Sequence, residues 1–139
     1  MPTMPTAPAA VDPNPAATAA RLRLAVTRLH RVLRQQSADG LTLTQLSALA
    51  TVGRFGPITL GDLASVEQLS PPSVTKIVGK LEAADLVTRT VDPADRRVSR
   101  VATTPAGEHY LDEVRHRREA WLADRLTQLD PRDLARLAD

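Results

Sequence analysis

The chain has 139 residues, of which 42% are hydrophobic and 24% charged, and its formal net charge at pH 7 is +2. These values are typical of one soluble globular domain, and the near balance of acids and bases makes the total charge uninformative about partners. The absence of cysteine excludes disulfides and thiolate metal sites, and no apolar run could span a membrane, so we expect a cytoplasmic protein without a membrane partner.

A Pro-rich tail and a first helix are expected at the N-terminus. Residues 1–15 contain five of the eleven prolines, and such a composition cannot bury enough surface to offset ordering entropy, which predicts a disordered tail. From about residue 16 to 36, apolar residues spaced by three or four predict a helix with one apolar seam: Leu22, Val26, Leu29 and Leu33. The arginines beside this seam are either a solvated face or contacts to phosphate or to a partner subunit.

A second helix is expected after Gly40, which interrupts the chain. Thr42 is a suitable N-cap, and the helix should run to about Val52 before Gly53 and the Gly56-Pro57 pair end it. The residues expected to be buried are Leu43, Leu46, Leu49 and Ala50.

A third helix should follow a short extended piece at Ile58. Thr59 is its expected N-cap, and its apolar residues are Leu60, Leu63 and Ala64. A turn at residues 66–69 would then join it to the next helix, which gives a helix-turn-helix.

Both lysines of the protein, Lys76 and Lys80, lie one helical turn apart with no acidic residue between them. Ser70 is a good N-cap for the helix that contains them, Pro71 suits its first position, and Pro72 is tolerated in the first turn. One face of this helix is apolar, with Val74, Ile77, Val78 and Leu81. The opposite face carries small, hydroxyl-bearing or cationic residues: Ser73, Thr75, Lys76, Gly79 and Lys80.

The second of these faces is suited to a DNA groove. Small residues allow close approach, hydroxyls can form hydrogen bonds with base edges, and ammonium groups neutralise phosphate. We therefore predict a DNA recognition helix; the alternative is a solvated helix face without a partner. Arg54, at the turn after the second helix, is a further candidate for a phosphate contact.

The period then changes to that of strands. Residues 86–91 and 98–103 are rich in β-branched side chains and flank a polar loop at residues 92–97, which predicts a β-hairpin. A hairpin directly after a recognition helix is a wing. Arg96 and Arg97 at its tip could lie along or inside a minor groove.

Two helices should complete the chain, a long one from Thr104-Pro105 to about Leu129 and a short one from Asp130-Pro131 to Asp139. Their apolar positions include Tyr110, Leu111, Val114, Trp121, Leu122, Leu126, Leu134 and Leu137. With the first helix, they present more apolar surface than a small winged helix can cover. This favours a two-fold dimer that holds two recognition helices roughly 34 Å apart.

Other chemistry finds little support in the sequence. His109 and His116, with Asp112 and Glu113 between them, are either solvent-facing polar residues or metal ligands, and we expect the first. No motif arranges the serines, histidines and acids for catalysis, so we expect neither enzyme activity nor a cofactor.

From about residue 20 to 139, the order of elements resembles that of the MarR family of winged-helix transcriptional regulators. The most specific part is the wing. Asp92-Pro93-Ala94-Asp95-Arg96-Arg97, followed by Val101, Thr104 and Gly107, is similar to the family signature D-x-x-D-x-R…V-x-L-T-x-x-G, although Thr103 stands where the family usually has Leu. The segments Ser73-Val74-Thr75-Lys76 and Leu86-Val87-Thr88-Arg89 are similar to its recognition helix and first strand.

The resemblance implies specific roles for the wing residues. Asp95 would hold Arg97 by an ion pair, Arg97 would reach the minor groove, and Arg96 would be the more exposed neighbour. It also implies a homodimer with interleaved N- and C-terminal helices and a pseudo-palindromic operator. A small aromatic or phenolic acid would be the effector, bound between the dimer helices and the DNA-binding lobe.

We therefore expect a mainly α fold with a small β-hairpin wing, in which residues 16–139 form one domain. A winged helix-turn-helix lobe would occupy about 42–104, and dimerisation helices would occupy 16–36 and 105–139. The residues expected to contact double-stranded DNA are Ser70, Pro72, Ser73, Thr75, Lys76, Lys80, Asp95, Arg96 and Arg97. Those expected in the dimer interface are Leu22, Val26, Leu29, Trp121, Leu122, Leu126, Leu134 and Leu137.

The expected function is that of a sequence-specific transcriptional regulator that acts as a repressor. Two alternatives remain: a winged-helix module for protein–protein assembly, and a protein that coats DNA without regard to sequence.

Overall fold

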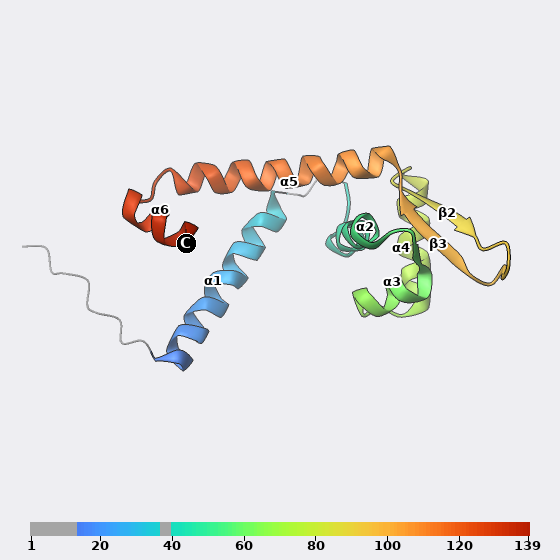
Figure 1. The fold of residues 1–139 in the computed structure, drawn as a ribbon, viewed down its shortest axis with the longest axis horizontal. Coiled ribbons are helices and arrows are strands. Elements are labelled where there is room, and N and C mark those ends of the chain that lie inside the picture. The colour runs from blue at the N-terminus through green and yellow to red at the C-terminus, as the bar shows by residue number, and fades with distance from the viewer. Residues whose placement is uncertain (1–13, 37–39) are drawn as a thin grey trace, which may run out of the picture. The chain divides into compact units, whose positions relative to one another are not determined.

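The computed structural model describes residues 14–36 and 40–139, so the predicted tail at residues 1–13 lies outside the described residues. The chain divides into two compact units, residues 1–33 and residues 34–139, which are described separately. The described residues form six helices and three strands (Figure 1), which confirms a mainly α fold with a small sheet.

Helix α1 spans Pro15–Gln35 and confirms the predicted first helix. Asn14 begins it, because its Oδ1 accepts a hydrogen bond from the N–H of Ala16 at 3.0 Å. Pro15 therefore belongs to the helix and not, as predicted, to the tail. None of its residues is buried within the described structure.

Helix α2 spans Leu43–Phe55 and begins with the predicted cap. The side chains of Thr42 and Gln45 each accept a hydrogen bond from the other's backbone N–H, at 3.2 and 3.0 Å. The predicted end at Val52 is wrong by one turn. Gly53 continues the helix, and its lack of a side chain lets Leu111 of a later helix approach closely, since an added Cβ would lie 2.8 Å from Leu111 Cδ1.

The buried face of α2 differs from the predicted one. Leu46 and Leu49 are buried as expected, together with Gln45, Ala48 and Val52. Leu43 and Ala50, which were expected to be buried, are exposed. Leu43 lies in the first turn, beyond the edge of the core, and Ala50 points into a cleft described below.

Helices α3 (Leu60–Glu67) and α4 (Pro71–Ala83) follow as predicted, and the extended piece expected at Ile58 is strand β1 (Ile58–Thr59). The hydroxyls of Thr59 and Ser70 cap the two helices by accepting hydrogen bonds from Asp62 N–H at 3.1 Å and Ser73 N–H at 3.4 Å. The turn between them begins later than predicted. Helix α3 continues to Glu67 and stops only where Gln68 adopts a left-handed conformation, with φ 53° and ψ 44°.

Strands β2 (Val87–Val91) and β3 (Ser99–Thr103) form the predicted hairpin. A third strand was not predicted: β1 pairs with β3 on the side away from β2, with Ile58 opposite Val101, so the sheet order is β1-β3-β2. The two residues that precede α3 are too few to show the period of a strand, and only their pairing with β3 identifies them as a strand.

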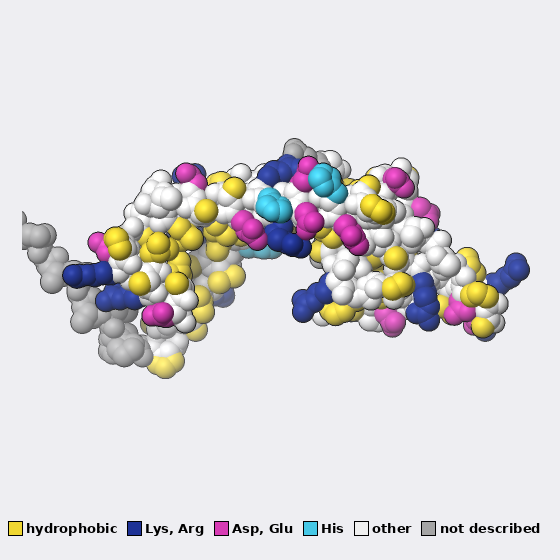
Figure 2. Space-filling view, turned by 45° about the horizontal axis from the view of Figure 1, so that its top comes forward, with side chains coloured by type: hydrophobic (Ala, Val, Ile, Leu, Met, Phe, Trp, Pro, Cys, Tyr) yellow, Lys and Arg dark blue, Asp and Glu magenta, His cyan; other side chains and the backbone are white. Residues whose placement is uncertain are grey.

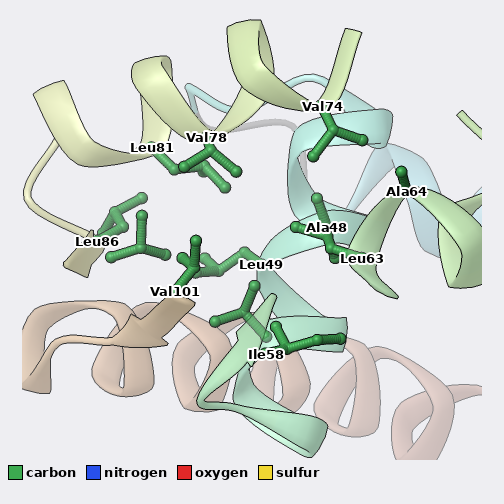
Figure 3. Packing of buried hydrophobic residues seen from close by; sticks show 12 residues of the cluster. Ala48, Leu49, Ile58, Leu63, Ala64, Val74, Val78, Leu81, Leu86 and Val101 are labelled. Atoms are coloured by element: carbon green, nitrogen blue, oxygen red, sulfur yellow. The ribbon is translucent and has the colours of Figure 1, made fainter. Parts of the chain in front are cut away.

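The core lies where α2, α3 and α4 pack on this sheet. Val74, Val78 and Leu81 of α4 are at most 2% exposed. Figure 3 shows them pointing toward the residues that the other elements contribute, among them Leu49 of α2, Leu63 of α3 and Val101 of β3. The buried side chains of this core are aliphatic, in keeping with a chain that contains one Phe, one Tyr and one Trp.

Helix α5 (Pro105–Leu126) begins at Thr104, whose hydroxyl accepts a hydrogen bond from Gly107 N–H and donates one to the Asp85 carbonyl. It ends before the predicted Leu129, because the following amides form tighter i to i−3 hydrogen bonds, from Gln128 to Arg125 and from Leu129 to Leu126. Helix α6 (Pro131–Ala138) begins at the predicted Asp130-Pro131 pair, and Asp130 caps it by accepting a hydrogen bond from the Arg132 N–H at 2.8 Å.

At the start of α5, the backbone of Gly107 lies close to that of Leu86, just before β2. A Cβ at Gly107 would lie 2.0 Å from the Leu86 carbonyl oxygen, which also accepts the N–H of Thr104. We expect Gly107→Ala to lower the free energy of unfolding by about 1–3 kcal/mol, because the backbone must move apart. Urea denaturation followed by circular dichroism measures this.

Gly61→Ala is the matched control. Gly61 lies in α3, and an added Cβ would meet nothing within 4 Å. This substitution should be neutral or should stabilise the protein by up to about 1 kcal/mol, because Ala favours helix. Equal effects of the two substitutions would contradict the close approach at Gly107.

Candidate nucleic-acid interface

The outer face of α4 is fixed by the burial of its inner face. Because Val74, Val78 and Leu81 are in the core, the residues on the opposite side must point outward. The predicted contact residues of this helix are all exposed: Pro72, Ser73, Thr75, Lys76 and Lys80. The structure therefore brings them together on one solvent-facing surface, the outer face of α4.

Local hydrogen bonds hold the hydroxyls at the start of this face. The Ser70 and Ser73 hydroxyl oxygens are 2.8 Å apart, and the Thr75 hydroxyl donates to the Pro71 carbonyl at 3.0 Å. Ser70 is thus mainly a helix cap, as expected. Ser73 and Thr75 retain lone pairs that can accept further hydrogen bonds from a ligand.

The two lysines keep their charge available. Within the described residues, neither Lys76 nor Lys80 forms an ion pair. Glu82, two residues after Lys80, lies 3.8 Å from Arg89 of β2 instead. The positive charge of the outer face of α4 is therefore free to act on an anionic partner.

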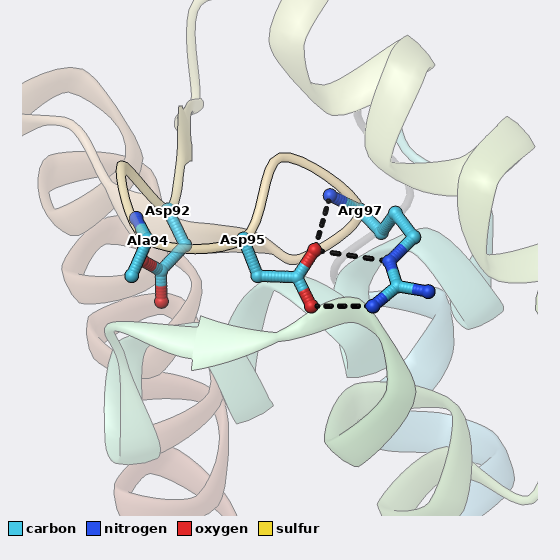
Figure 4. A network of polar contacts seen from close by, with 4 residues as sticks. All are labelled: Asp92, Ala94, Asp95 and Arg97. Atoms are coloured by element: carbon cyan, nitrogen blue, oxygen red, sulfur yellow. Dashed lines mark hydrogen bonds and ion pairs between the residues drawn. The ribbon is translucent and has the colours of Figure 1, made fainter.

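The loop between β2 and β3 contains the predicted ion pair of Asp95 and Arg97 (Figure 4). The guanidinium group donates from Nε to Oδ1 at 3.1 Å and from Nη2 to Oδ2 at 3.2 Å, and the Arg97 backbone N–H also donates to Oδ1. Asp95 therefore fixes both the backbone and the side chain of Arg97. This two-bond geometry is the strongest that a carboxylate and a guanidinium can form.

The charge of this pair persists at neutral pH. The Arg97 guanidinium, followed by the Arg97 backbone N–H, holds the pKa of Asp95 below its usual value. The contribution of the ion pair is therefore present at and above the usual carboxyl range, and it is lost only as the pH falls through the lowered pKa.

Both tip arginines remain accessible. The Arg97 side chain is 91% exposed despite its partner, and Arg96 is also exposed. Figure 2 shows Lys and Arg side chains projecting at the outer end of the β2–β3 hairpin, at the right of the view. The wing thus presents a second cationic surface.

A cleft lies between α2 and α5. Its volume is about 660 Å³. Its lining combines apolar residues with three arginines and three acids: Leu46, Ala50, Gly53, Arg54, Glu108, Leu111, Asp112, Val114, Arg115, Arg118, Glu119 and Leu122. It lies between the lobe and a predicted dimerisation helix, where the resemblance implied an effector site, but the sequence did not identify its lining, because its walls lie more than fifty residues apart and meet only in the folded chain.

Arg54, a candidate for phosphate, lies in the wall of this cleft, and its guanidinium group stacks 5.2 Å from the Phe55 ring. It does not lie on the outer face of α4.

The residues predicted for the dimer interface fall into two groups. Leu22, Val26 and Leu29 of α1 and Leu134 and Leu137 of α6 are between 40% and 66% exposed. Trp121, Leu122 and Leu126 of α5 are half-buried, and the Arg125 guanidinium group stacks 5.0 Å from the Trp121 ring.

The two histidines of α5 contact different residues. His109 Nε2 lies 3.1 Å from Glu113 Oε1, whereas His116 Nδ1 lies 2.7 Å from the Asp112 carbonyl. Acidic and histidine side chains follow α5 in Figure 2, yet within residues 14–36 and 40–139 no three of them come together as metal ligands. In the same residues, no helix is both long enough and apolar enough to cross a lipid bilayer.

Comparison with known proteins agrees with this geometry. A model of the MarR family matches residues 41–99. The chain is 38% identical over 123 residues to an HTH-type transcriptional regulator of Mycobacterium tuberculosis, covering 86% of each protein. It is 29% identical over 107 residues to the HTH-type transcriptional repressor MdtR of Bacillus subtilis, covering 77% of this chain and 69% of that protein.

A solved structure shares the fold. The transcriptional regulator Tm0710 from Thermotoga maritima matches with a TM-score of 0.73 at 26% identity, over 86% of this chain and 87% of that one.

The ion pair of Asp95 and Arg97 should determine how ordered the Arg97 side chain is. Asp95→Asn should loosen the Arg97 side chain, because the substitution removes the charge that binds the guanidinium, while global stability should change little because the pair is exposed. Nuclear magnetic resonance relaxation of the Arg97 Nε–H group measures this. In the unmutated protein, the same loosening should appear only in acid, below the usual carboxyl range.

Asp92→Asn is the control for charge. Asp92 lies in the same loop, and its Oδ1 accepts the Ala94 N–H, which an amide oxygen can also do. If this variant loosens Arg97 as much as Asp95→Asn does, total loop charge, and not the ion pair, orders the wing.

Proposed function

Because this chain belongs to the MarR family of transcriptional regulators, we propose that it is a homodimeric repressor. It binds a pseudo-palindromic operator and is released from it by a small aromatic acid. The observation that carries this proposal is the outer face of α4, where exposed hydroxyls and two cations lie opposite the buried Val74, Val78 and Leu81.

The chemistry of the two cationic surfaces supports DNA as the partner. Ser73, Thr75 and the lysines would enter the major groove, where hydroxyls and ammonium groups can contact base edges and phosphates. Arg97, held by Asp95, would enter or follow the adjacent minor groove, while Arg96 would contact phosphate. Reading both grooves from one lobe requires a wing with a fixed geometry, and the ion pair supplies it.

The exposed apolar residues of α1 and α6 support a dimer. Hydration of leucine side chains that are 40–66% exposed is unfavourable, and a second surface that covers them would remove this cost. Two copies related by a two-fold axis would bury both groups and place two α4 helices at successive turns of a duplex. The half-buried Trp121, Leu122 and Leu126 would lie in the same interface.

The cleft between α2 and α5 supports regulation by a small acid. Its leucines can contact an aromatic ring, and Arg54 offers a cation to a carboxylate. Occupancy would change the relation between α5 and the DNA-binding lobe, with a coupling of about 1–3 kcal/mol. The repressor role rests on the similarity to MdtR.

Competition binding tests this function against both alternatives. The full chain is titrated onto DNA from the region flanking its own gene, in the presence of an unrelated duplex, and its mass in solution is measured. A large preference for one site and a particle of twice the chain mass support the repressor. Equal binding to both duplexes supports a DNA-coating protein, and no binding supports an assembly module.

Lys80 should contribute one phosphate contact. Lys80→Ala is expected to weaken operator binding and to reduce the slope of log affinity against log salt concentration by about one unit, because one fewer counterion is released. Lys80→Arg, which keeps the charge, should keep the slope. An unchanged slope in Lys80→Ala would remove this residue from the phosphate contacts.

The cleft should be the effector site. Calorimetry with a panel of phenolic acids is expected to show binding by the unmutated protein, and a bound acid should weaken operator affinity by about 5- to 150-fold. Ala50→Phe, which fills the cleft from an exposed position on α2, should abolish the heat and retain operator binding. Neither heat nor operator release across the panel would contradict an effector of this class.

A further inference from the structure

The last residue of α3 is hydrogen-bonded to α2 by both of its carboxylate oxygens. Glu67 Oε2 accepts the Ser47 hydroxyl at 2.8 Å, and Glu67 Oε1 accepts the Thr51 hydroxyl. Ser47 and Thr51 are four residues apart and therefore lie on the same side of α2. One side chain thus ties the end of α3 to two successive turns of another helix.

The chain immediately after Glu67 decides where the recognition helix starts. Gln68 has a left-handed backbone, which a non-glycine residue adopts only when the surrounding structure holds it there. Its N–H donates to the carbonyls of Ala64 and Ser65, and the N–H of Leu69 donates to Ala64 at 3.0 Å. The N-cap of α4, Ser70, follows directly.

The side of α2 that lines the cleft is next to the side that carries Ser47 and Thr51. Leu46 and Ala50 line the cleft and directly precede Ser47 and Thr51 in the helix, so the two sides are about 100° apart. Any rotation or shift of α2 caused by an occupant of the cleft moves the two hydroxyls as well. Their shared partner is the residue that precedes the turn into α4.

We propose that Glu67 is a positioning residue, which sets where α4 begins relative to α2 and transmits movement of α2 to the recognition helix. This inference rests on the proposed function, because it assigns the route from the cleft to the DNA-binding surface. The carboxylate suits the task, since hydrogen bonds to a charged acceptor are stronger and shorter than neutral ones. Both of its oxygens are engaged, so the carboxylate cannot turn without breaking a bond.

Five variants of the full chain test this role, the fifth being the triple variant that combines Glu67→Ala with Ser47→Ala/Thr51→Val. Glu67→Ala removes both hydrogen bonds, Glu67→Gln keeps an amide oxygen and a donor for the two hydroxyls, and Ser47→Ala/Thr51→Val removes the partners. Asp62→Ala is the control, because it deletes the same charge from the same helix, and in the hydrogen bond between Asp62 and Thr59 the donor is the backbone N–H of Asp62, which the substitution keeps. All variants are compared at a temperature at which circular dichroism shows them folded.

The first measurement is amide hydrogen exchange in the free protein, which does not depend on DNA binding. Glu67→Ala and the double variant are expected to raise the exchange rate of the first amides of α4, including Val74, by roughly tenfold, because local opening becomes easier. Glu67→Gln should restore most of the protection, and Asp62→Ala should leave it intact. Unchanged exchange in Glu67→Ala would overturn the proposal whether or not the protein binds DNA.

The second measurement is the ratio of operator affinity to unrelated-duplex affinity. This ratio should fall roughly tenfold in Glu67→Ala and in the double variant, and Glu67→Ala should cause no further loss when the two hydroxyls are already absent. A ratio like that of Asp62→Ala, or full additivity with the double variant, would overturn the role in DNA reading. If the unmutated protein itself shows no preference, the proposed function fails, and hydrogen exchange alone decides the role of Glu67.

Discussion

The structure depends on the burial of one face of α4. Val74, Val78 and Leu81 are at most 2% exposed and contact residues from α2, α3 and the sheet, so the helix cannot rotate about its axis without exposing them. The residues opposite must then face outward, and they include both lysines of the protein. The recognition surface is the outer side of a helix whose inner side is packed in the core, so the close packing of the core restricts its movement.

The wing is ordered by different means. Its tip has no core beneath it, and its order comes from Asp95, which binds the backbone and the guanidinium of a residue two positions away. Such a pair adds little to global stability because it is exposed, yet it selects one direction for a long, flexible side chain. The lobe thus combines a surface held by hydrophobic packing with a surface held by charge.

Helix α2 connects these parts to the rest of the chain. One side supplies Leu49 and Val52 to the core, another supplies Ala50 and Gly53 to the cleft, and between these sides Ser47 and Thr51 reach Glu67. A helix with three occupied sides cannot move without affecting all three neighbours. This makes α2 the element through which occupancy of the cleft can reach α4.

The sequence by itself determined the features that depend on neighbours along the chain. Thr42, Thr59, Ser70 and Thr104 cap helices as predicted, the apolar period of α4 gave its buried side, and the spacing of Asp95 and Arg97 gave the ion pair. Only the tertiary structure decided the third strand, the exposure of Leu43 and Ala50, the residues that line the cleft and the two hydrogen bonds of Glu67. Each of these depends on how separate segments of the chain pack against one another, which leaves no periodic signal in the sequence.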